Sequence, residues 1–286
     1  MYHVNAIAAI ALAAAFCTAN VGAQAFEDSK YPNLQGQWTR ATAPGTSDEP
    51  RFDPSRPPGR GQEPPLTPEY HAIFEANLHE REAGVPGTWP GPSCLPPGMP
   101  AQMTAYRPLE FIVLPNITYI RVDYVRETRR RIYTDGRDWP KQVQDGFDGY
   151  SIGQWVDEDK DGRYDVLEVE TRHFKGPRNF DLSGIPLHED NETVIKERIF
   201  LDKTDQNLLH DEITVFDHAL RRPWTVVKSY RRSTDPKPQW DEYTCVWESN
   251  TLRIGDETYL LDKDGFIRPA KKDQPPPSLK YFAVRK

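Results

Sequence analysis

Short stretches of alternating hydrophobic and polar residues fill the chain from Leu109 onward. They are rich in β-branched and aromatic side chains and are separated by turn signals such as Pro-Asn and Asp-Gly, so they predict strands and hairpins. No helical pattern alternates with them, and a parallel sheet is therefore not expected. The predicted strand segments are 109–115, 117–125, 129–137, 149–156, 164–174, 193–201, 208–217, 224–232, 240–248 and 257–269.

About ten antiparallel strands in one unit predict a mainly β fold, either a lipocalin-like barrel or a strongly curved sheet. Closing the sheet into a barrel would remove its exposed edges. A Gly-x-Trp tripeptide occurs twice, at residues 36–38 and 153–155. Lipocalin-like barrels often contain such a tripeptide, with the Trp plugging one end of the barrel.

The part of the chain before these strands predicts a proline-rich arm and one short helix. Residues 43–68 are crowded with Pro, Gly, Ser and charged side chains and predict an extended loop. A helix is predicted over 68–82, because Thr67 can cap it and Pro suits its first position. Its apolar stripe is expected to contain Tyr70, Ile73, Phe74 and Leu78.

The first residues predict export. The apolar run at 7–16, followed by Ala-Gln-Ala at 23–25, is typical of a secretory signal peptide, although its n-region contains only His3 as a basic residue. The run is too short to span a bilayer, and no later segment is apolar enough to do so. We therefore expect a periplasmic or secreted protein that does not span the membrane. The expected organisation is a signal peptide at 1–25, the strand, arm and helix at 26–100, and the barrel at 101–286.

The net charge bears on possible binding partners, and the cysteines bear on disulfide formation. The net charge is -7 without a basic tract, which makes nucleic acid a poor candidate partner. The expected mature chain keeps Cys94 and Cys245, and export favours a disulfide between them. Two free or buried thiols are the alternative.

Residues 157–165 read Asp-x-Asp-x-Asp-Gly-x-x-Asp, a spacing that suits a calcium loop. Carboxylates this close repel one another without a cation, and Gly162 permits a tight turn. We expect a structural calcium ion, with Glu168 a doubtful further ligand because the flanks read as strands. A solvated hairpin with an Asp-Gly turn is the alternative. The expected ligands are Asp157, Asp159, Asp161, Arg163 through its carbonyl, and Asp165.

Three residues are candidates for acid–base chemistry. Glu197 shares a strand face with apolar residues, so burial would raise its pKa; a structural Glu–Arg pair is the alternative. Tyr133 precedes the Asp135-Gly136 turn, where it could hold a polar ligand with Arg137, or simply flank a surface ion pair. His188 lies in a long polar loop, 175–192, and could equally be an exposed loop residue.

No sequence motif indicates a redox cofactor or a nucleophile. The chain has no dinucleotide fingerprint, no Gly-x-Ser-x-Gly and no zinc-type His spacing, so no organic cofactor is expected. These observations favour a barrel that binds a small hydrophobic or aromatic molecule, with lyase or isomerase turnover, for example of a plant-derived aromatic compound. A non-catalytic ligand-binding protein or a structural envelope protein is the alternative.

Seven motifs in order resemble an uncharacterised family of secreted bacterial β-rich proteins. They are Cys-x-Pro-x-Gly-x-Pro from residue 94, Arg-x-Ile-Tyr-x-Asp-Gly-Arg at 130–137, Gly-x-Ser-x-Gly-x-Trp at 149–155, Val-Glu-Thr at 169–171, Glu-Arg at 197–198, Pro-Trp at 223–224 and a late Cys.

The resemblance covers about residues 94–248, and it implies export, a β-rich fold and two paired cysteines, but no activity. Many members have a short Trp-Glu-Gly-Asp hairpin where this chain has its Asp-rich loop, which marks a subgroup. Many also have His-Pro after Asp-Gly-Arg, where this chain has Trp139-Pro140.

Overall fold

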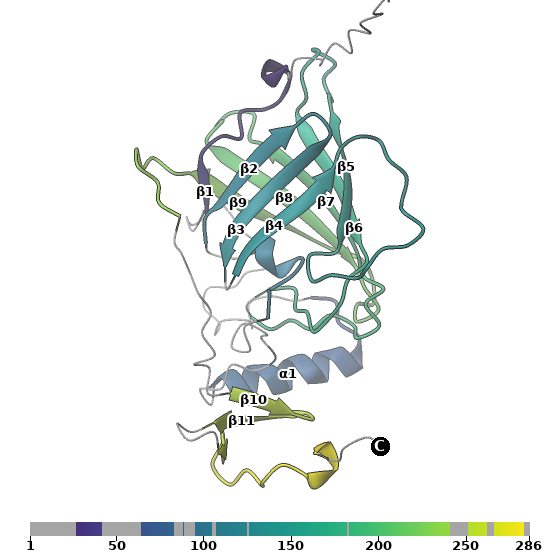
Figure 1. Ribbon diagram of the computed structural model, residues 1–286, viewed down its shortest axis with the longest axis vertical. Helices are drawn as coiled ribbons and strands as arrows, with labels where there is room; N and C mark the ends of the chain where they lie inside the picture. Colours follow the sequence, from purple (N-terminus) through teal and green to yellow (C-terminus); the bar gives the residue numbers. More distant parts are fainter. Residues whose placement is uncertain are drawn as a thin grey trace, which may run out of the picture.

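Nine strands among the described residues form a closed barrel in which neighbours in sequence are neighbours in space (Figure 1). The computed structural model describes residues 27–41, 64–82, 88, 95–104, 107–124, 126–181, 183–240, 251–261 and 266–282. The predicted mainly β, lipocalin-like class is confirmed. The barrel strands are β1 (Gln37–Arg40), β2 (Leu109–Leu114), β3 (Ile117–Tyr124), β4 (Arg126–Tyr133), β5 (Tyr150–Val156), β6 (Val166–Arg172), β7 (Val194–Leu201), β8 (Leu208–Phe216) and β9 (Trp224–Arg232).

One pair of barrel strands departs from the expected antiparallel order. β4 and β5 run parallel, whereas the other neighbouring pairs, including β1 and β9, are antiparallel. Strands joined by hairpins alternate in direction, so an odd number cannot close a ring through antiparallel pairs alone. The connection over residues 134–149 carries the chain back before β5 begins, and it resolves this parity at the β4–β5 junction.

The period-two alternation of the strands determines what fills the barrel. On β7 the buried positions are Ile195, Glu197, Ile199 and Leu201, and on β8 they are Leu209, Asp211, Ile213 and Val215. Successive side chains of a strand point to opposite faces, so these two sets face the interior of the barrel. The interior is therefore mainly aliphatic, with a charged side chain on each of these two strands.

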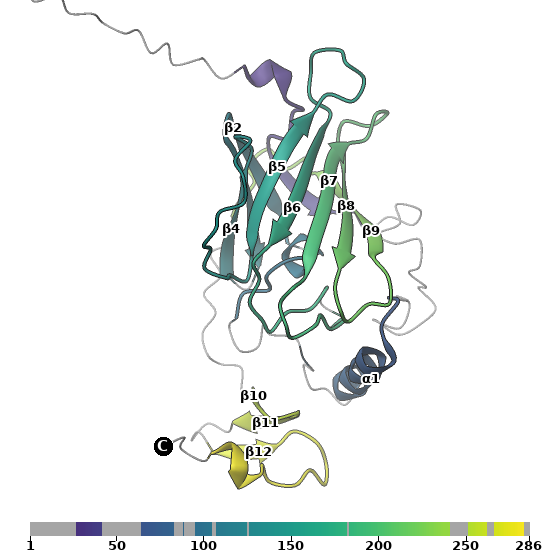
Figure 2. The same ribbon diagram turned by 90° about the vertical axis from the view of Figure 1, so that its right-hand side faces the viewer.

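The helix α1 (Pro68–Glu82) has the predicted bounds and lies beneath one end of the barrel (Figure 2). The Tyr70 backbone N–H donates to Thr67 Oγ1 at 3.4 Å, as expected of an N-terminal cap. Tyr70, Phe74 and Leu78 are buried, but Ile73 is 38% exposed. The expected stripe was wrong at Ile73, since Asn77 instead turns inward and donates to the Gly184 carbonyl at 3.0 Å.

A short 3₁₀ helix, η3 (Ala101–Thr104), is buried along its whole length and enters the barrel from the same end (Figure 1). Two side chains from the wall hold its carbonyls. Tyr230 on β9 donates its hydroxyl to the Met103 carbonyl, and Arg40 on β1 donates to the Thr104 carbonyl at 2.7 Å. Both bonds satisfy carbonyls near the end of the short helix, which would otherwise be left unpaired in a dry interior.

The first Gly-x-Trp tripeptide packs inward where β1 meets the end of β9. Trp38 at the start of β1 is fully buried, and its indole N–H donates to the Leu34 carbonyl at 3.0 Å. The guanidinium of Arg232, its register partner at the end of β9, lies 4.3 Å from the centre of the indole ring. In the second tripeptide, Trp155 is partly buried and meets the Tyr31 ring edge-on at 5.3 Å.

The last strands form a sheet of their own. β10 (Thr251–Ile254), β11 (Glu257–Leu261) and β12 (Ile267–Pro269) pair with one another, although the segment 257–269 was expected among the barrel strands and no strand was expected at 251–254. β9 already pairs with β1, so the closed barrel offers no edge for a further strand. The ammonium of Lys271 lies 3.2 Å from the Glu80 carboxylate and links this region to α1. The remaining short helices are η1 (Asp28–Lys30) and η4 (Leu279–Tyr281).

Several expectations concern residues that the structure does not describe. The expected signal peptide, most of the proline-rich arm, Cys94, Cys245 and most of segment 240–248 lie outside the described residues. Within the described part of the chain, no helix is both long and apolar enough to cross a membrane.

Candidate functional site

A charged pair lies in the interior of the barrel, fully removed from water. Arg130 on β4 and Glu197 on β7 are each 1% exposed. The guanidinium Nη1 donates to Glu197 Oε1 at 2.7 Å, and Nη2 makes a second, short contact with Oε2. This two-point arrangement is the strong form of an Arg–carboxylate pair. Glu197 therefore faces the interior, as an acid–base candidate requires, but it is held in the structural Glu–Arg pair that was the alternative.

Two hydroxyls extend this pair into a network. Arg130 Nη2 donates to Thr171 Oγ1 at 2.9 Å, and Nε contacts Ser151 Oγ at 3.4 Å. Ser151 and Thr171 are hydrogen-bonded to each other at 2.8 Å. The network thus joins β4, β5, β6 and β7. Each of the three guanidinium nitrogens of Arg130 has a hydrogen-bond acceptor in it. We call Arg130, Ser151, Thr171 and Glu197 the interior network.

Each member of the interior network comes from a different short motif of the sequence. Arg130 opens the Arg-x-Ile-Tyr motif, and Ser151 is the serine of Gly-x-Ser-x-Gly-x-Trp. Thr171 ends Val-Glu-Thr, and Glu197 begins Glu-Arg. Four motifs that are separate in sequence therefore meet at one buried point, which gives them a common physical role in holding the wall together.

Burial and charge act against each other at Arg130. Burial by itself lowers the pKa of the guanidinium, but the carboxylate of Glu197 outweighs it and leaves the pKa raised. Asp211 adds to this effect from β8. Arg130 is therefore a permanent cation inside the barrel, and it requires a carboxylate beside it.

Asp211 is the second carboxyl group of the interior, and it is not satisfied. It is fully buried on β8, and neither of its oxygens has a hydrogen-bond partner among the described residues. Burial raises the pKa of this carboxyl well above its usual range, and the negative charge of Glu197 raises it further. Arg130 and Lys228 oppose this shift without reversing it. Asp211 is therefore a group that stays protonated far more readily than an exposed aspartate.

Lys228 on β9 is the register partner of Asp211 and is also fully buried. Its ammonium lies 5.9 Å from the centre of the Phe180 ring, which comes from the loop between β6 and β7. Other buried polar groups of the described chain also lack hydrogen-bond partners, among them the side-chain amide of Gln102 in η3 and the hydroxyl of Thr118 on β3. Buried polar groups normally have partners, so these groups indicate a place for water or for a ligand.

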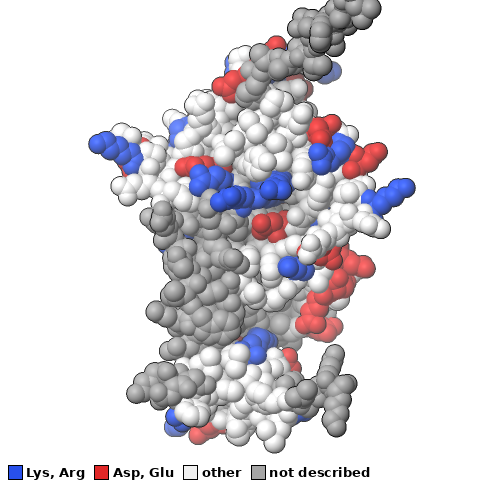
Figure 3. All heavy atoms as spheres, viewed as in Figure 1, with Lys and Arg blue, Asp and Glu red and all other residues white. Residues whose placement is uncertain are grey.

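The outer wall is different, because its charges are hydrated. On the face shown in Figure 3, basic side chains form a band across the barrel and acidic ones gather along one side. The exposed Glu170–Arg172 contact on β6 is an example of such a surface pair, with an Nε to Oε1 distance of 2.6 Å. A surface depression of about 640 Å³ lies over the outer face of β5–β8 and is lined by residues such as Trp139, Gln154 and Lys196.

Tyr133 and His188 do not join Glu197. Tyr133 ends β4, where its ring stacks on Tyr150 at 5.0 Å and the Arg137 guanidinium covers it at 3.8 Å. Arg137 also pairs with Asp135 at 2.6 Å, so this turn carries the surface ion pair that was the alternative. His188 lies in the loop between β6 and β7. No hydrogen bond, ion pair or ring contact links any two of these three described candidates.

The acidic loop lies at the other end of the barrel, between β5 and β6 (Figure 2). One carboxylate oxygen from each of Asp157, Asp159 and Asp165 lies within 4.8 Å of the others. Asp161 is not in this group, and its Oδ1 accepts the Arg163 backbone N–H at 2.8 Å. The backbone N–H groups of Asp161 and Gly162 donate to Asp157 at 3.2 and 2.9 Å, which folds the loop around that carboxylate.

Glu168 turns away from this loop. It accepts a hydrogen bond from the Gln154 side chain at 3.0 Å on the outer face of the barrel. Gly162 has φ +91°, the left-handed region that the tight turn was expected to need. Of the four aspartates expected to bind calcium, Asp157, Asp159 and Asp165 converge and Asp161 does not.

Comparison with models of known protein families gives no match, and comparison with curated proteins gives none either.

Sequence reasoning missed Asp211, Lys228 and Arg130. The first two carry the same signal that singled out Glu197, because each is a charged residue at an inward position of an alternating strand: Leu209, Asp211 and Ile213 share one face. Arg130 gives no such signal, since its strand is a run of charged residues on both faces.

Replacing Glu197 with Gln is expected to lower the free energy of unfolding by about 3–5 kcal/mol, because it leaves the buried Arg130 charge without a counter-ion. The matched control is Glu170→Gln in the exposed pair with Arg172, where a loss of about 1 kcal/mol or less is expected. Urea unfolding of both variants measures the difference. Equal effects of the two changes would show that the interior pair is not dry.

Asp211→Asn tests the raised pKa of the buried carboxyl. The Asp211 carboxyl binds its proton more tightly in the native state than in the unfolded chain. The stability that this proton provides is complete below the unfolded-state pKa of about 4, and it is lost as pH rises through the higher native-state pKa. Wild-type protein should therefore lose stability relative to Asp211→Asn over that window. Thermal unfolding across a pH series measures this, with Glu212→Gln on the outer face of β8 as control. Parallel pH profiles for wild type and Asp211→Asn would contradict it.

Proposed function

We propose that the protein binds a small, mainly apolar molecule inside the barrel and that a polar group of this molecule meets Asp211. The observation that carries the proposal is the fully buried Asp211 carboxyl group without a hydrogen-bond partner among the described residues. A buried polar group left unmatched costs about 1–3 kcal/mol. A ligand that donates to it, or accepts from its protonated form, removes that cost.

The composition of the interior supports a ligand of this kind. Binding sites for small molecules are lined mainly by apolar and aromatic side chains with a few placed polar groups. Here the wall contributes aliphatic residues, Trp38, Phe180 and Tyr230 are fully buried, and Asp211, Gln102 and Thr118 are among the unmatched polar groups. An aromatic molecule with one hydroxyl, carbonyl or amine group suits this combination.

The interior also supports acid–base chemistry of the lyase or isomerase type. A carboxyl group with a raised pKa can hold a proton near neutral pH and transfer it to a bound molecule. Burial raises the pKa of Asp211 in this direction, whereas Glu197 is held as the counter-ion of Arg130. Asp211 therefore replaces Glu197 as the first candidate for the acid or base, and Lys228 is the neighbouring charge that would adjust it.

Non-catalytic capture of the same ligand is the second candidate function. The same unmatched groups bind a molecule without turning it over, and the closed end formed by α1 and the loops suits retention. Product formation separates the two, since a binding protein returns its ligand unchanged.

Calcium at the acidic loop is proposed as a structural ion. Three carboxylates converge there, and oxygen ligands are those that calcium prefers. The loop is exposed at the end of the barrel opposite α1, so the ion would stiffen the β5–β6 hairpin from outside the interior that holds Asp211. Export, a periplasmic or secreted location and the Cys94–Cys245 disulfide are proposed with it, on the apolar run at 7–16 and the family resemblance.

A panel of aromatic metabolites, screened by thermal shift on the mature protein, should yield compounds that raise the melting temperature. Asp211→Asn should weaken binding of the best compound by about tenfold, because leaving a buried polar group of the complex unsatisfied costs about 1–3 kcal/mol. Glu212→Gln should bind it normally. A ligand whose affinity is the same in both variants would place the site elsewhere.

Calcium should raise the melting temperature of protein that has been treated with a chelator. At a hundredfold excess over its Kd, a ligand that binds only the native state contributes about 2.7 kcal/mol. The double variant Asp157→Asn, Asp159→Asn should lose this response, whereas Glu168→Gln on the adjoining strand should keep it. A melting temperature that is unchanged by chelator and by calcium would contradict the proposal.

A further inference from the structure

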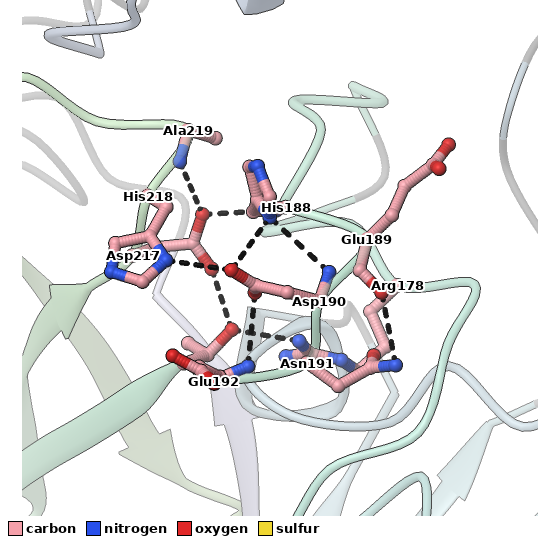
Figure 4. Close-up of polar contacts among 10 residues, drawn as sticks. Arg178, His188, Glu189, Asp190, Asn191, Glu192, Asp217, His218 and Ala219 are labelled. Carbon is pink, nitrogen blue, oxygen red and sulfur yellow. Dashed lines mark hydrogen bonds and ion pairs between the residues drawn. The ribbon is translucent and has the colours of Figure 1, made fainter.

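Two loops meet beneath the barrel around three side chains that the interior site does not use. His188 and Asp190 belong to the loop between β6 and β7, and His218 belongs to the loop between β8 and β9. One ligand atom from each of the three lies within 4.8 Å of the others. Figure 4 shows both imidazoles turned toward the Asp190 carboxylate from two sides.

The donor atoms converge on a single point. Asp190 Oδ2 lies 2.6 Å from Nδ1 of His218 and 2.9 Å from Nδ1 of His188. The two imidazole rings are 5.6 Å apart and nearly perpendicular, at 85°, so both can present a nitrogen to the same atom without stacking. Three donors from two separate loops thus form one face of a coordination site.

A second set of contacts holds this face in place. Asp217, next to His218, accepts the backbone N–H of His188 at 2.9 Å and that of Ala219 at 2.8 Å. Its other oxygen accepts the Thr193 hydroxyl at 2.5 Å. The Tyr70 ring of α1 lies 5.2 Å from the His188 ring and limits its movement. Outer contacts of this kind orient metal ligands in known sites.

The local charge also favours a cation. Asp190 and Asp217 both act on His218, with Glu192 adding to them. Arg178 is the opposing charge, and it is buried beneath Thr193, to which it donates at 2.7 Å. The side toward solvent is open, because His218 is 64% exposed.

We propose that His188, Asp190 and His218 form a binding site for a divalent transition metal ion such as zinc. Two imidazoles and one carboxylate are ligands that zinc and its neighbours accept, whereas calcium and magnesium prefer oxygen alone. Zinc bonds of about 2.0–2.1 Å place tetrahedral ligands about 3.3 Å apart, so the ion needs Asp190 Oδ2 to move away from each imidazole nitrogen by less than about 1 Å. Water would complete the coordination on the exposed side.

Such an ion would fasten the closed end of the barrel. The loop that carries His188 also places Phe180, Ile185 and Leu187 in the core, and Phe180 packs on Trp224 at the start of β9 with 4.5 Å between ring centres. Joining this loop to the one that carries His218 would hold these side chains against the barrel. The inference concerns this end of the molecule and does not depend on a ligand at Asp211.

The test uses tag-free mature protein that has been stripped of metal, with zinc as the probe and calcium in excess to fill the acidic loop. Calorimetric titration should show one zinc ion per chain. His218→Ala should weaken zinc binding by about 100-fold or more, since loss of even an outer contact costs 10–100-fold. Cobalt should give the visible absorption of a four- or five-coordinate site in wild type and lose it in the variant.

Three further variants make the outcome decisive. His173→Ala removes a loop histidine outside the cluster and should bind zinc normally. Asp190→Asn keeps the side-chain shape and should still lose affinity, which covers the case in which a truncated histidine disturbs the fold. Asp211→Asn should bind zinc like wild type. Zinc binding that is unaffected by both His218→Ala and Asp190→Asn, or absent from wild type, would overturn the proposal and show that the cluster is only hydrogen-bonded.

Discussion

The charged pair between Arg130 and Glu197 braces a junction that the backbone holds weakly. β4 and β5 are joined by only two register pairs, whereas β3 and β4 share eight. Arg130 reaches from β4 past Ser151 on β5 and Thr171 on β6 to Glu197 on β7. Side-chain hydrogen bonds therefore hold β4 to β5–β7 at this junction, where few backbone pairs do. Because the pair is dry, losing either partner leaves an unpaired charge, so the brace works only when it is complete.

The need for this brace follows from the number of strands. A closed ring of nine strands must contain at least one parallel junction, because an odd number of strands cannot alternate in direction all the way round, and a parallel junction requires a long connection instead of a tight turn. Residues 134–149 provide it, and Tyr133, Arg137 and Tyr150 stack around the place where the chain leaves and returns. Closure, the parallel junction and the buried ion pair are thus linked. The unmatched Asp211 lies in the same interior, where its electrostatic coupling to Glu197 keeps it from ionising easily.

The sequence allowed much of this to be predicted, because the signals were local. Thr67, Pro68 and the spacing of Tyr70, Phe74 and Leu78 define α1, and alternation defines the barrel strands and the inward position of Glu197. What it could not give was long-range pairing. Nothing in the segment 129–137 shows that β5 lies parallel beside it, or that the last three strands pair among themselves. The acid–base chemistry of a side chain can be recognised in a sequence, but its distance from other side chains cannot. The sequence therefore could not show that Glu197, Tyr133 and His188 lie apart. His188 instead lies with Asp190 and His218, two residues that become its neighbours only when two loops meet.

The short β1 strand gives the barrel a second weak junction, since only two register pairs join it to β2. The meander β2–β4 is thus bounded on both sides by junctions of two pairs each, while its own strands and those from β5 to β9 are paired at length. Cooperative units of a protein follow such boundaries. Local opening of the wall is therefore expected to begin at these two junctions, and Arg130 is the side chain that ties the meander to β7 across one of them.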